Sequence, residues 1–591
     1  MMAAFNIQLD PTPKIDSLVF PDIVHLVPPD RDYDLLKDSY DYARKRNISE
    51  DQRPKLQLRS LFYDDLSISA FDEHFMDGGK DRNGYSRRPK TLAGEGAPKV
   101  LQAIRTYTQD VELINYRLDV QDDLAQNPSL IPAFETFYGK IIQANNLHYS
   151  AFARDSNRNK IRDQWGRWVY ASWQNLPTAF SIVDSAMSEL EKVLNSTTSR
   201  GMQEITQFFS AVRKHPVYAE WHENIHKIVN GGKYFLAFQF DVGDGMTNMI
   251  ELGMVSDGSP IDILLQTPST QNGIVNHQLN NELIIRRTHG VVKTELGHLL
   301  QASFKLDFET LDQFCNILTT GMHEQLSFYA ALGTIYSKYM SYGIPVCRPI
   351  VGKGDSGMEM RKTIHPVVAV QAKLDNKKLM FNDYQIYPHQ KGILLTGPND
   401  AGKTCSGKAF ALNIAMAQAG IQCPAEYVRI GKPVRDILTH FVSKDDIEKG
   451  KGRHRNELSR ARRICELLTP EDYLLFDEPC GGTDTKSGLQ DSWALVRYAD
   501  QLNIPTVFAT HLHELSARVE AGELTGFVNM QAEMILENDE HVLTHRIISG
   551  RATESFGSRI SNEERVTVAA LDELIARRIA AGELDDKLIR R

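Results

Sequence analysis

Residues 397–404 of this chain read Gly397-Pro398-Asn399-Asp400-Ala401-Gly402-Lys403-Thr404. An apolar run that begins at Gly392 precedes them, and a helix is expected to follow over residues 406–419. A strand, a glycine-rich turn and a helix in this order bind phosphates, because backbone N–H groups and the positive end of the helix dipole surround the anion. Lys403 is expected to reach the β- and γ-phosphates, and the Thr404 hydroxyl to bind Mg²⁺. The stretch predicts an α/β domain that binds ATP and Mg²⁺ through residues 397–404.

Two more apolar strands lead into polar side chains. Residues 473–476 are followed by Asp477 and Glu478, and residues 505–510 are followed by His511. Because ligands of open α/β sheets sit at the carboxyl ends of the strands, we expect these three side chains to converge on the nucleotide. Phosphoryl transfer needs a carboxylate for the metal and a group that positions the attacking water. Asp477 is therefore the candidate Mg²⁺ ligand, and Glu478 and His511 are the candidate catalytic residues.

Nine short stretches, taken together, resemble the MutS family in their order and spacing. They are His365-Pro366-Val367-Val368, Phe381-Asn382-Asp383, Thr396-Gly397-Pro398-Asn399, Ala417-Gln418-Ala419-Gly420, Cys423-Pro424-Ala425, Ser443-Lys444-Asp445-Asp446 with Glu457-Leu458, Asp477-Glu478-Pro479-Cys480-Gly481-Gly482-Thr483-Asp484, Ala509-Thr510-His511-Leu512-His513-Glu514-Leu515 and Ser555-Phe556-Gly557. The resemblance covers about residues 345–560. It implies an ABC-type P-loop ATPase domain. Lys403 and Asp477 are only 74 residues apart, which leaves little room for the helical subdomain of a transporter-type ABC ATPase.

The resemblance also implies a multidomain chain. Residues 97–344 are expected to form an α-helical core with levers, and residues 345–560 the α/β ATPase domain. A small strand-rich insert over about residues 233–298 is either a clamp that touches DNA or a connecting sheet. Residues 561–591 are expected to form a helical tail, which is either a dimer contact or a solvated terminal helix. No role is assigned to residues 1–96.

Local patterns support this division. Val183, Met187, Leu190 and Leu194 recur at helical spacing, as expected for a core helix. Residues 234–238 and 282–285 are apolar runs typical of strands. Residues 307–340 contain no proline and hold an apolar helical stripe, which predicts a long helix before the ATPase domain.

The composition is that of a large globular protein. The chain has 591 residues, 42% of them hydrophobic, and a net charge of −9, so any DNA contact is expected to come from local basic patches. The six cysteines form no C-x-x-C pair, which argues against a zinc site. No apolar run reaches the roughly 18 residues of a membrane span, and residues 1–10 do not resemble a signal peptide. A cytoplasmic location is expected.

Two features depart from the MutS pattern. No mismatch-binding domain is recognised ahead of the core, so the chain resembles the truncated homologues; Phe71-Asp72-Glu73 is either a mismatch wedge or an ordinary helix segment. In the loop that crosses the family's dimer, Gly452 stands where the family has a serine, and basic residues follow it. Arg453 and Arg455 are therefore candidate arginine fingers for the partner's γ-phosphate, and a solvated basic loop is the alternative.

These features predict a homodimeric, ATP-dependent DNA-binding protein. It is expected to hydrolyse ATP to change its grip on DNA, in mismatch repair or a related repair or recombination process, together with other repair proteins. The alternative is an ABC-class P-loop switch or scaffold, as in chromosome maintenance, that does not recognise mismatches.

Overall fold

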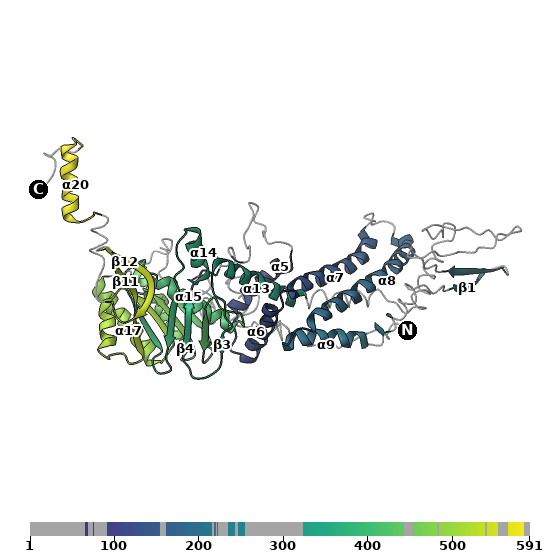
Figure 1. Cartoon of the computed structure of the whole chain (residues 1–591), viewed down its shortest axis with the longest axis horizontal. Coiled ribbons are helices and arrows are strands. Elements are labelled where there is room, and N and C mark those ends of the chain that lie inside the picture. The colour runs from purple at the N-terminus through teal and green to yellow at the C-terminus, as the bar shows by residue number, and fades with distance from the viewer. Residues whose placement is uncertain are drawn as a thin grey trace. The chain divides into compact units, whose positions relative to one another are not determined.

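The computed structural model describes residues 65–68, 75, 91–153, 161–214, 218–219, 222, 235–242, 246–253, 323–441, 453–481, 484–537, 540–552 and 565–583 (Figure 1). These residues divide into two compact units. One holds the described residues of 89–96 and 119–333, and the other those of 27–88, 97–118 and 334–591. The four-domain division stays a prediction, although residues 97–118, expected in the helical core, pack in the unit that contains the ATPase region.

The first unit is mostly helical, as expected. Its helices, three of which also contribute residues to the second unit, are α5 (Leu92–Arg105), α6 (Val111–Gln126), α7 (Leu130–Ala153), α8 (Ile161–Leu194), α9 (Arg200–Lys214) and α13 (His323–Tyr342). Helices α7 and α8 pack along one another. Phe134 of α7 is buried, as are Val183, Met187 and Leu190 of the predicted stripe on α8. The helical pattern of this region is therefore confirmed.

The insert contains one described hairpin. Strands β1 (Phe235–Val242) and β2 (Met246–Gly253) pair antiparallel from Phe235 opposite Gly253 to Val242 opposite Met246. The first of these strands was expected from its apolar run. The second expected strand, residues 282–285, lies outside the described residues, so the choice between a DNA clamp and a connecting sheet stays a prediction.

The second unit is built on two sheets. The larger has the order β12-β11-β6-β10-β9-β8, and only the edge strand β12 runs antiparallel to its neighbour. Its strands are β6 (Gly392–Thr396), β8 (Ile437–His440), β9 (Tyr473–Asp477), β10 (Thr506–Thr510), β11 (Phe527–Glu537) and β12 (Glu540–Ser549). The smaller has the order β3-β7-β4-β5, with β3 (Ile350–Val351), β4 (Met358–Thr363), β5 (Asn382–Ile386) and β7 (Tyr427–Ile430).

Helix α15 (Lys403–Gln418) contacts strands of both sheets. Thirteen of its 16 residues are buried, as expected for a helix that is apolar on every side. The Phe410 ring lies 4.9 Å from Tyr384 of the smaller sheet and 5.6 Å from Tyr473 of the larger one, measured between ring centroids. The expected helix over residues 406–419 is therefore confirmed, and it begins at Lys403.

Three further helices form a second core with the larger sheet. They are α16 (Arg453–Leu467), α17 (Thr485–Gln501) and α18 (His513–Glu520). Ile464, Val496 and Leu515 from these helices pack with Phe476 and Phe508 of strands β9 and β10. Because side chains alternate along a strand, Tyr473 contacts α15 while Phe476 joins this second core.

A short N-terminal segment also packs in this unit. Leu66 and Ile68 are fully buried, the Leu66 carbonyl oxygen lies 2.9 Å from His365 Nε2, and Arg460 Nη2 donates to Asp65 Oδ2 at 2.6 Å. The motif Phe71-Asp72-Glu73 lies outside the described residues, so the wedge interpretation stays a prediction.

Helices α14 (Pro366–Leu374) and α20 (Val568–Ala580) complete the described elements. None of the residues of α20 is buried, and Thr567 caps its first turn by accepting a hydrogen bond from the Ala570 N–H. A helix in the expected tail is thus confirmed, but its role is not tested by the fold. Within the described part of the chain, no helix has the length and apolar character needed to span a bilayer.

Candidate functional site

The glycine-rich turn lies at the carboxyl end of β6, inside the larger sheet. Gly397 has a φ of +144°, and a side chain there would meet Ala532 Cβ at 2.8 Å. Gly402 has a φ of +88° and immediately precedes the first residue of α15. Glycine adopts such angles without the steric cost that a side chain would add, so the turn wraps tightly and the helix begins directly at Lys403.

Lys403 is folded into this turn. Its side chain is almost fully buried, and Nζ donates to the carbonyl oxygens of Gly397 at 2.9 Å and Pro398 at 2.7 Å. Nζ also lies 3.8 Å from Glu478 Oε1. Burial lowers the pKa of Lys403, and the carboxylates of Glu478 and Asp477 oppose that effect. The Lys403 ammonium thus lies within the turn, and a phosphate can accept the hydrogen bonds that the two carbonyl oxygens now accept.

Thr404 and Asp477 form a direct pair at the opposite wall of the turn. Thr404 Oγ1 donates to Asp477 Oδ1 at 3.1 Å and to Oδ2 at 2.9 Å. Burial is the main cause that raises the pKa of Asp477 to about 6, and the adjacent Glu478 adds to it. A hydroxyl and one carboxylate are the protein ligands that Mg²⁺ takes beside nucleotide phosphates. The donor set therefore fits Mg²⁺ held jointly with phosphate.

Glu478 and His511 lie next to this pair. Residues of β9 and β10 are in register, Ala509 opposite Asp477, so both strands end at the same level. His511 Nδ1 is 3.6 Å from Glu478 Oε1, and about half of the His511 side chain is exposed. Glu478 has a φ of +49°, a strained conformation for a residue with a side chain, and such strain concentrates at active sites. The structure thus brings the predicted catalytic residues together, while their roles stay a prediction.

The other predicted loop residues line the outside of the turn. Asn399 and Asp400 are exposed, Asp400 with a φ of +61°, and Ala401 is buried.

A cavity of about 470 Å³ adjoins the turn, and the sequence interpretation assigned it no role. Its lining includes Met380, Gly402, Cys405 and His545. His545 has a φ of +57° and lies where the register of β12 with β11 shifts, so an irregularity in the strand directs its side chain to the cavity. The signal available in the sequence was the stretch Phe381-Asn382-Asp383, which carried the family resemblance but no function.

Asn382 fixes this arrangement. Its Nδ2 donates to Ser406 Oγ at 2.9 Å and to the His545 carbonyl oxygen at 3.3 Å, and its Oδ1 accepts from the Ile547 N–H at 2.7 Å. One side chain therefore joins β5, α15 and β12 at the edge of the cavity.

The candidate dimer-crossing loop is only partly described. Gly452 lies outside the described residues. Arg453 is the first residue of α16, Arg455 in its first turn is exposed, and His454 Nε2 lies 3.4 Å from Asp491 Oδ2 of α17. No described contact tests whether an arginine reaches a second nucleotide, so the arginine finger stays a prediction.

Residues 393–577 match the family model of MutS domain V. The chain is 35% identical over 217 residues to the DNA mismatch repair protein MutS of Desulfitobacterium hafniense (strain Y51), a match that covers 36% of this chain and 24% of that protein. It is 32% identical over 237 residues to the same-named protein of Chlorobium limicola, covering 40% and 26% of the two chains, respectively. It is 28% identical over 302 residues to that of Carboxydothermus hydrogenoformans, covering 48% and 35%. The chain thus spans about a quarter to a third of the length of these relatives.

Proposed function

We propose, on the premise that residues 393–577 of this chain are a MutS domain V and hence an ABC-type ATPase domain, that the protein uses ATP to switch its grip on DNA. One observation carries the ATPase part of the proposal. Lys403 and Thr404 at the start of α15 meet Asp477 and Glu478 at the end of β9, with the Thr404 hydroxyl bonded directly to the Asp477 carboxylate.

The site offers a separate place for the phosphates and for the base and ribose of the nucleotide. Its phosphates take the place that the Gly397 and Pro398 carbonyl oxygens now occupy on Lys403 Nζ. Its base and ribose enter the adjoining cavity, whose volume of about 470 Å³ is within the range of small-molecule sites. His545 and Met380 provide a ring and a thioether for contact with the base.

The carboxylates of Asp477 and Glu478 have different roles in the proposed reaction. Thr404 and Asp477 would hold Mg²⁺, which would supply positive charge to offset the negative charge that develops on the phosphates during transfer. Glu478 accepts a proton from the attacking water or orients it, and His511, 3.6 Å away, fixes the Glu478 carboxylate or donates to the γ-phosphate. The reaction yields ADP and phosphate.

DNA binding is proposed from the relatives. The proteins that match this chain carry the name DNA mismatch repair protein MutS, and the matched part is the ATPase region. The net charge of −9 confines DNA contacts to local basic patches. We propose that the substrate is branched or single-strand-containing DNA, with single mismatches bound little better than homoduplex.

A binding comparison tests this proposal. Homoduplex, mismatched, branched and single-stranded oligonucleotides are titrated by fluorescence anisotropy, without nucleotide and with Mg·ATP or Mg·ADP, over a series of salt concentrations. We expect a steep loss of affinity with salt, because phosphate contacts release counterions. We also expect a difference of about 5-fold or more between the two nucleotide states.

The control for this comparison is Lys403→Ala, which should bind DNA with no response to nucleotide. Nucleotide binding without any salt-dependent DNA binding would support the alternative, an ABC-class switch or scaffold. A strong preference for one mismatch would instead support a mismatch sensor.

We further propose that the protein is a homodimer in which α20 pairs with α20 of a second copy. Val568, Leu571, Leu574 and Ile575 are exposed on this helix. An antiparallel pair places the acidic Asp572 and Glu573 of one helix near the basic Arg577 and Arg578 of the other, so the charges are self-complementary.

The dimer prediction is tested by sedimentation. Leu571→Asp combined with Leu574→Asp should shift the protein to the monomer, because burying two carboxylates in an apolar helix pair is costly. Ala569→Asp combined with Ala576→Asp is the matched control, because it adds the same two carboxylates at exposed positions of the helix other than the apolar ones. An unchanged dimer in the leucine variant would exclude α20 as the contact.

A further inference from the structure

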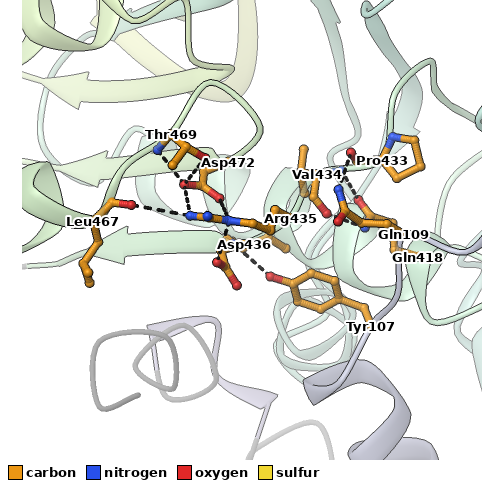
Figure 2. A network of polar contacts seen from close by, with 11 residues as sticks. Tyr107, Gln109, Gln418, Pro433, Val434, Arg435, Asp436, Leu467, Thr469 and Asp472 are labelled. Atoms are coloured by element: carbon orange, nitrogen blue, oxygen red, sulfur yellow. Dashed lines mark hydrogen bonds and ion pairs between the residues drawn. The ribbon is translucent and has the colours of Figure 1, made fainter. Parts of the chain in front are cut away.

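We infer that the far end of the P-loop helix is clamped to the chain segment 107–117 and that this polar clamp passes the nucleotide state on to helix α6. The inference rests on the proposed nucleotide binding. The clamp is defined as Tyr107, Gln109 and Arg117 on one side and Gln418, Ala419 and the β7–β8 loop (residues 431–436) on the other. Figure 2 shows Tyr107, Gln109, Gln418 and part of this loop.

Gln418 is the centre of the clamp. Its side chain is fully buried; Nε2 donates to the carbonyl oxygens of Thr108 at 3.1 Å and Val434 at 2.8 Å, and Oε1 accepts from the Val434 N–H at 2.8 Å. The Gln418 carbonyl oxygen accepts a further bond from the Thr108 N–H at 3.1 Å. A buried amide is tolerated only when its bonds are made, so this geometry fixes the end of α15 and both chain segments together.

Arg117 fastens the first turns of α6 to the same point. Its side chain is almost fully buried, and Nη1 donates to the Ala419 carbonyl oxygen at 2.7 Å, just beyond the carboxyl end of α15. A cation is favourable there because the helix dipole leaves negative charge at that end. The contact is close: a side chain at Gly420, whose φ is +70°, would meet Arg117 Cβ at 2.9 Å. Glycine at this position therefore allows α6 to approach α15.

The same segment is bound to the strands that carry the metal side of the site. Tyr107 Oη accepts from the Ile437 N–H, the first residue of β8, at 2.6 Å. Arg435 joins the β7–β8 loop to Asp472, with two bonds at 3.0 Å and 2.9 Å, and Asp472 directly precedes β9, which ends at Asp477. Figure 2 shows Arg435 pointing to Asp472 and the Leu467 carbonyl oxygen, and Tyr107 reaching the chain beside Asp436, where β8 begins.

Segment 107–117 is thus held by both halves of the nucleotide site. Helix α15 spans about 24 Å from the phosphate turn to Gln418 and is buried over most of its length, so it moves as a rod rather than bending. Helix α6 begins in this segment and runs from Val111 to Gln126, beyond Leu118 and into residues of the helical unit. A displacement of α15 or β9 on ATP binding therefore reaches α6 through the clamp.

Two variants loosen the clamp without touching the nucleotide site. Gln418→Met keeps the length of the side chain and removes all three of its hydrogen bonds. Tyr107→Phe removes a single hydroxyl and is the milder change, so it tests the clamp even if the first variant destabilises the fold. Tyr498→Phe is the matched control, because Tyr498 Oη donates to the Cys465 carbonyl oxygen at 2.9 Å and joins α17 to α16 instead.

The test is amide hydrogen exchange of the full chain, read by mass spectrometry without nucleotide and with Mg²⁺ and a non-hydrolysable ATP analogue. In the parent and in Tyr498→Phe, we expect the analogue to change exchange in residues 397–418 and also, by about 5-fold or more, in residues 111–126. In Gln418→Met and Tyr107→Phe, the change at residues 397–418 should remain and that at residues 111–126 should be lost.

The outcomes separate the two proposals. The proposed transmission through the clamp is wrong if residues 397–418 respond in the parent but residues 111–126 do not. It is also wrong if both clamp variants transmit the response unchanged. In either case the proposal of nucleotide binding is unaffected. If residues 397–418 show no response in the parent, the proposed function is wrong and the clamp falls with it.

Discussion

Glu478→Gln is expected to bind ATP about as well as the parent and to hydrolyse it about 10²–10⁴-fold more slowly, the range lost with a general base. Glutamine keeps the size of the side chain and its reach toward His511 and Lys403, but its amide cannot accept a proton at neutral pH. ATP affinity is measured with a fluorescent analogue, and the chemical step by single-turnover hydrolysis. Hydrolysis at the parent rate would remove Glu478 from the role of base.

Two comparisons make this result specific. Glu514→Gln changes an exposed carboxyl three residues beyond His511 and should leave turnover unchanged. His511→Ala should slow hydrolysis while ADP affinity stays close to that of the parent, because a histidine about half exposed beside Glu478 is placed for the reaction rather than for ground-state binding. An equal loss of ADP and ATP binding would identify His511 as a structural residue.

Asp477→Asn is expected to abolish Mg²⁺-dependent turnover and yet to stabilise the nucleotide-free protein. Burial raises the pKa of Asp477 to about 6 from an ordinary value of 3.8, so the folded state disfavours the ionised carboxylate. Each tenfold change in proton affinity corresponds to about 1.4 kcal/mol, so the buried carboxylate lowers the free energy of unfolding by at most about 3 kcal/mol at neutral pH. Asparagine does not bear that cost.

The direction of the Asp477 pKa shift determines how the stability of the protein depends on pH. Between pH 4 and 6 the folded protein binds the Asp477 proton more tightly than the unfolded chain does, so the contribution of Asp477 to stability falls as pH rises through this window and then stays low. In thermal unfolding measured without nucleotide, Asp477→Asn should therefore be more stable than the parent by the largest margin at neutral pH. The stabilities of the two proteins should become equal toward pH 4.

Added Mg²⁺ and ATP analogue should reverse the order. The cation compensates the buried carboxylate of the parent, whereas asparagine offers it a weaker ligand. If the variant proves less stable than the parent at neutral pH without nucleotide, then the Thr404–Asp477 hydrogen bonds outweigh the cost of burying the charge.

The local elements around the site could be predicted from sequence because each is determined by neighbours in the chain. The apolar runs at Gly392 and Tyr473 form β6 and β9, and the glycine-rich turn before Lys403 leads into α15. The order and spacing of residues are enough to predict such a motif, because a strand followed by a glycine-rich turn and a helix adopts one main geometry. Lys403-Thr404 was expected to open the helix over residues 406–419, and in the structure α15 begins at Lys403 because the left-handed φ of Gly402 ends the turn there.

Only the tertiary structure decided what these elements meet. The convergence of Glu478 and His511 on the nucleotide was predicted from their places at strand ends, but the order β6-β10-β9 that puts them beside Lys403 was not. Pairing between distant segments leaves no local signal in the sequence. The cavity beside the turn depends on an irregular residue, His545, that lies 143 positions after Gly402. The bonds of Gln418 to Thr108 cross 310 positions of the chain. A buried amide finds its partners only after the helices and sheets have packed, so the sequence determines the parts of the site, and packing determines what connects them.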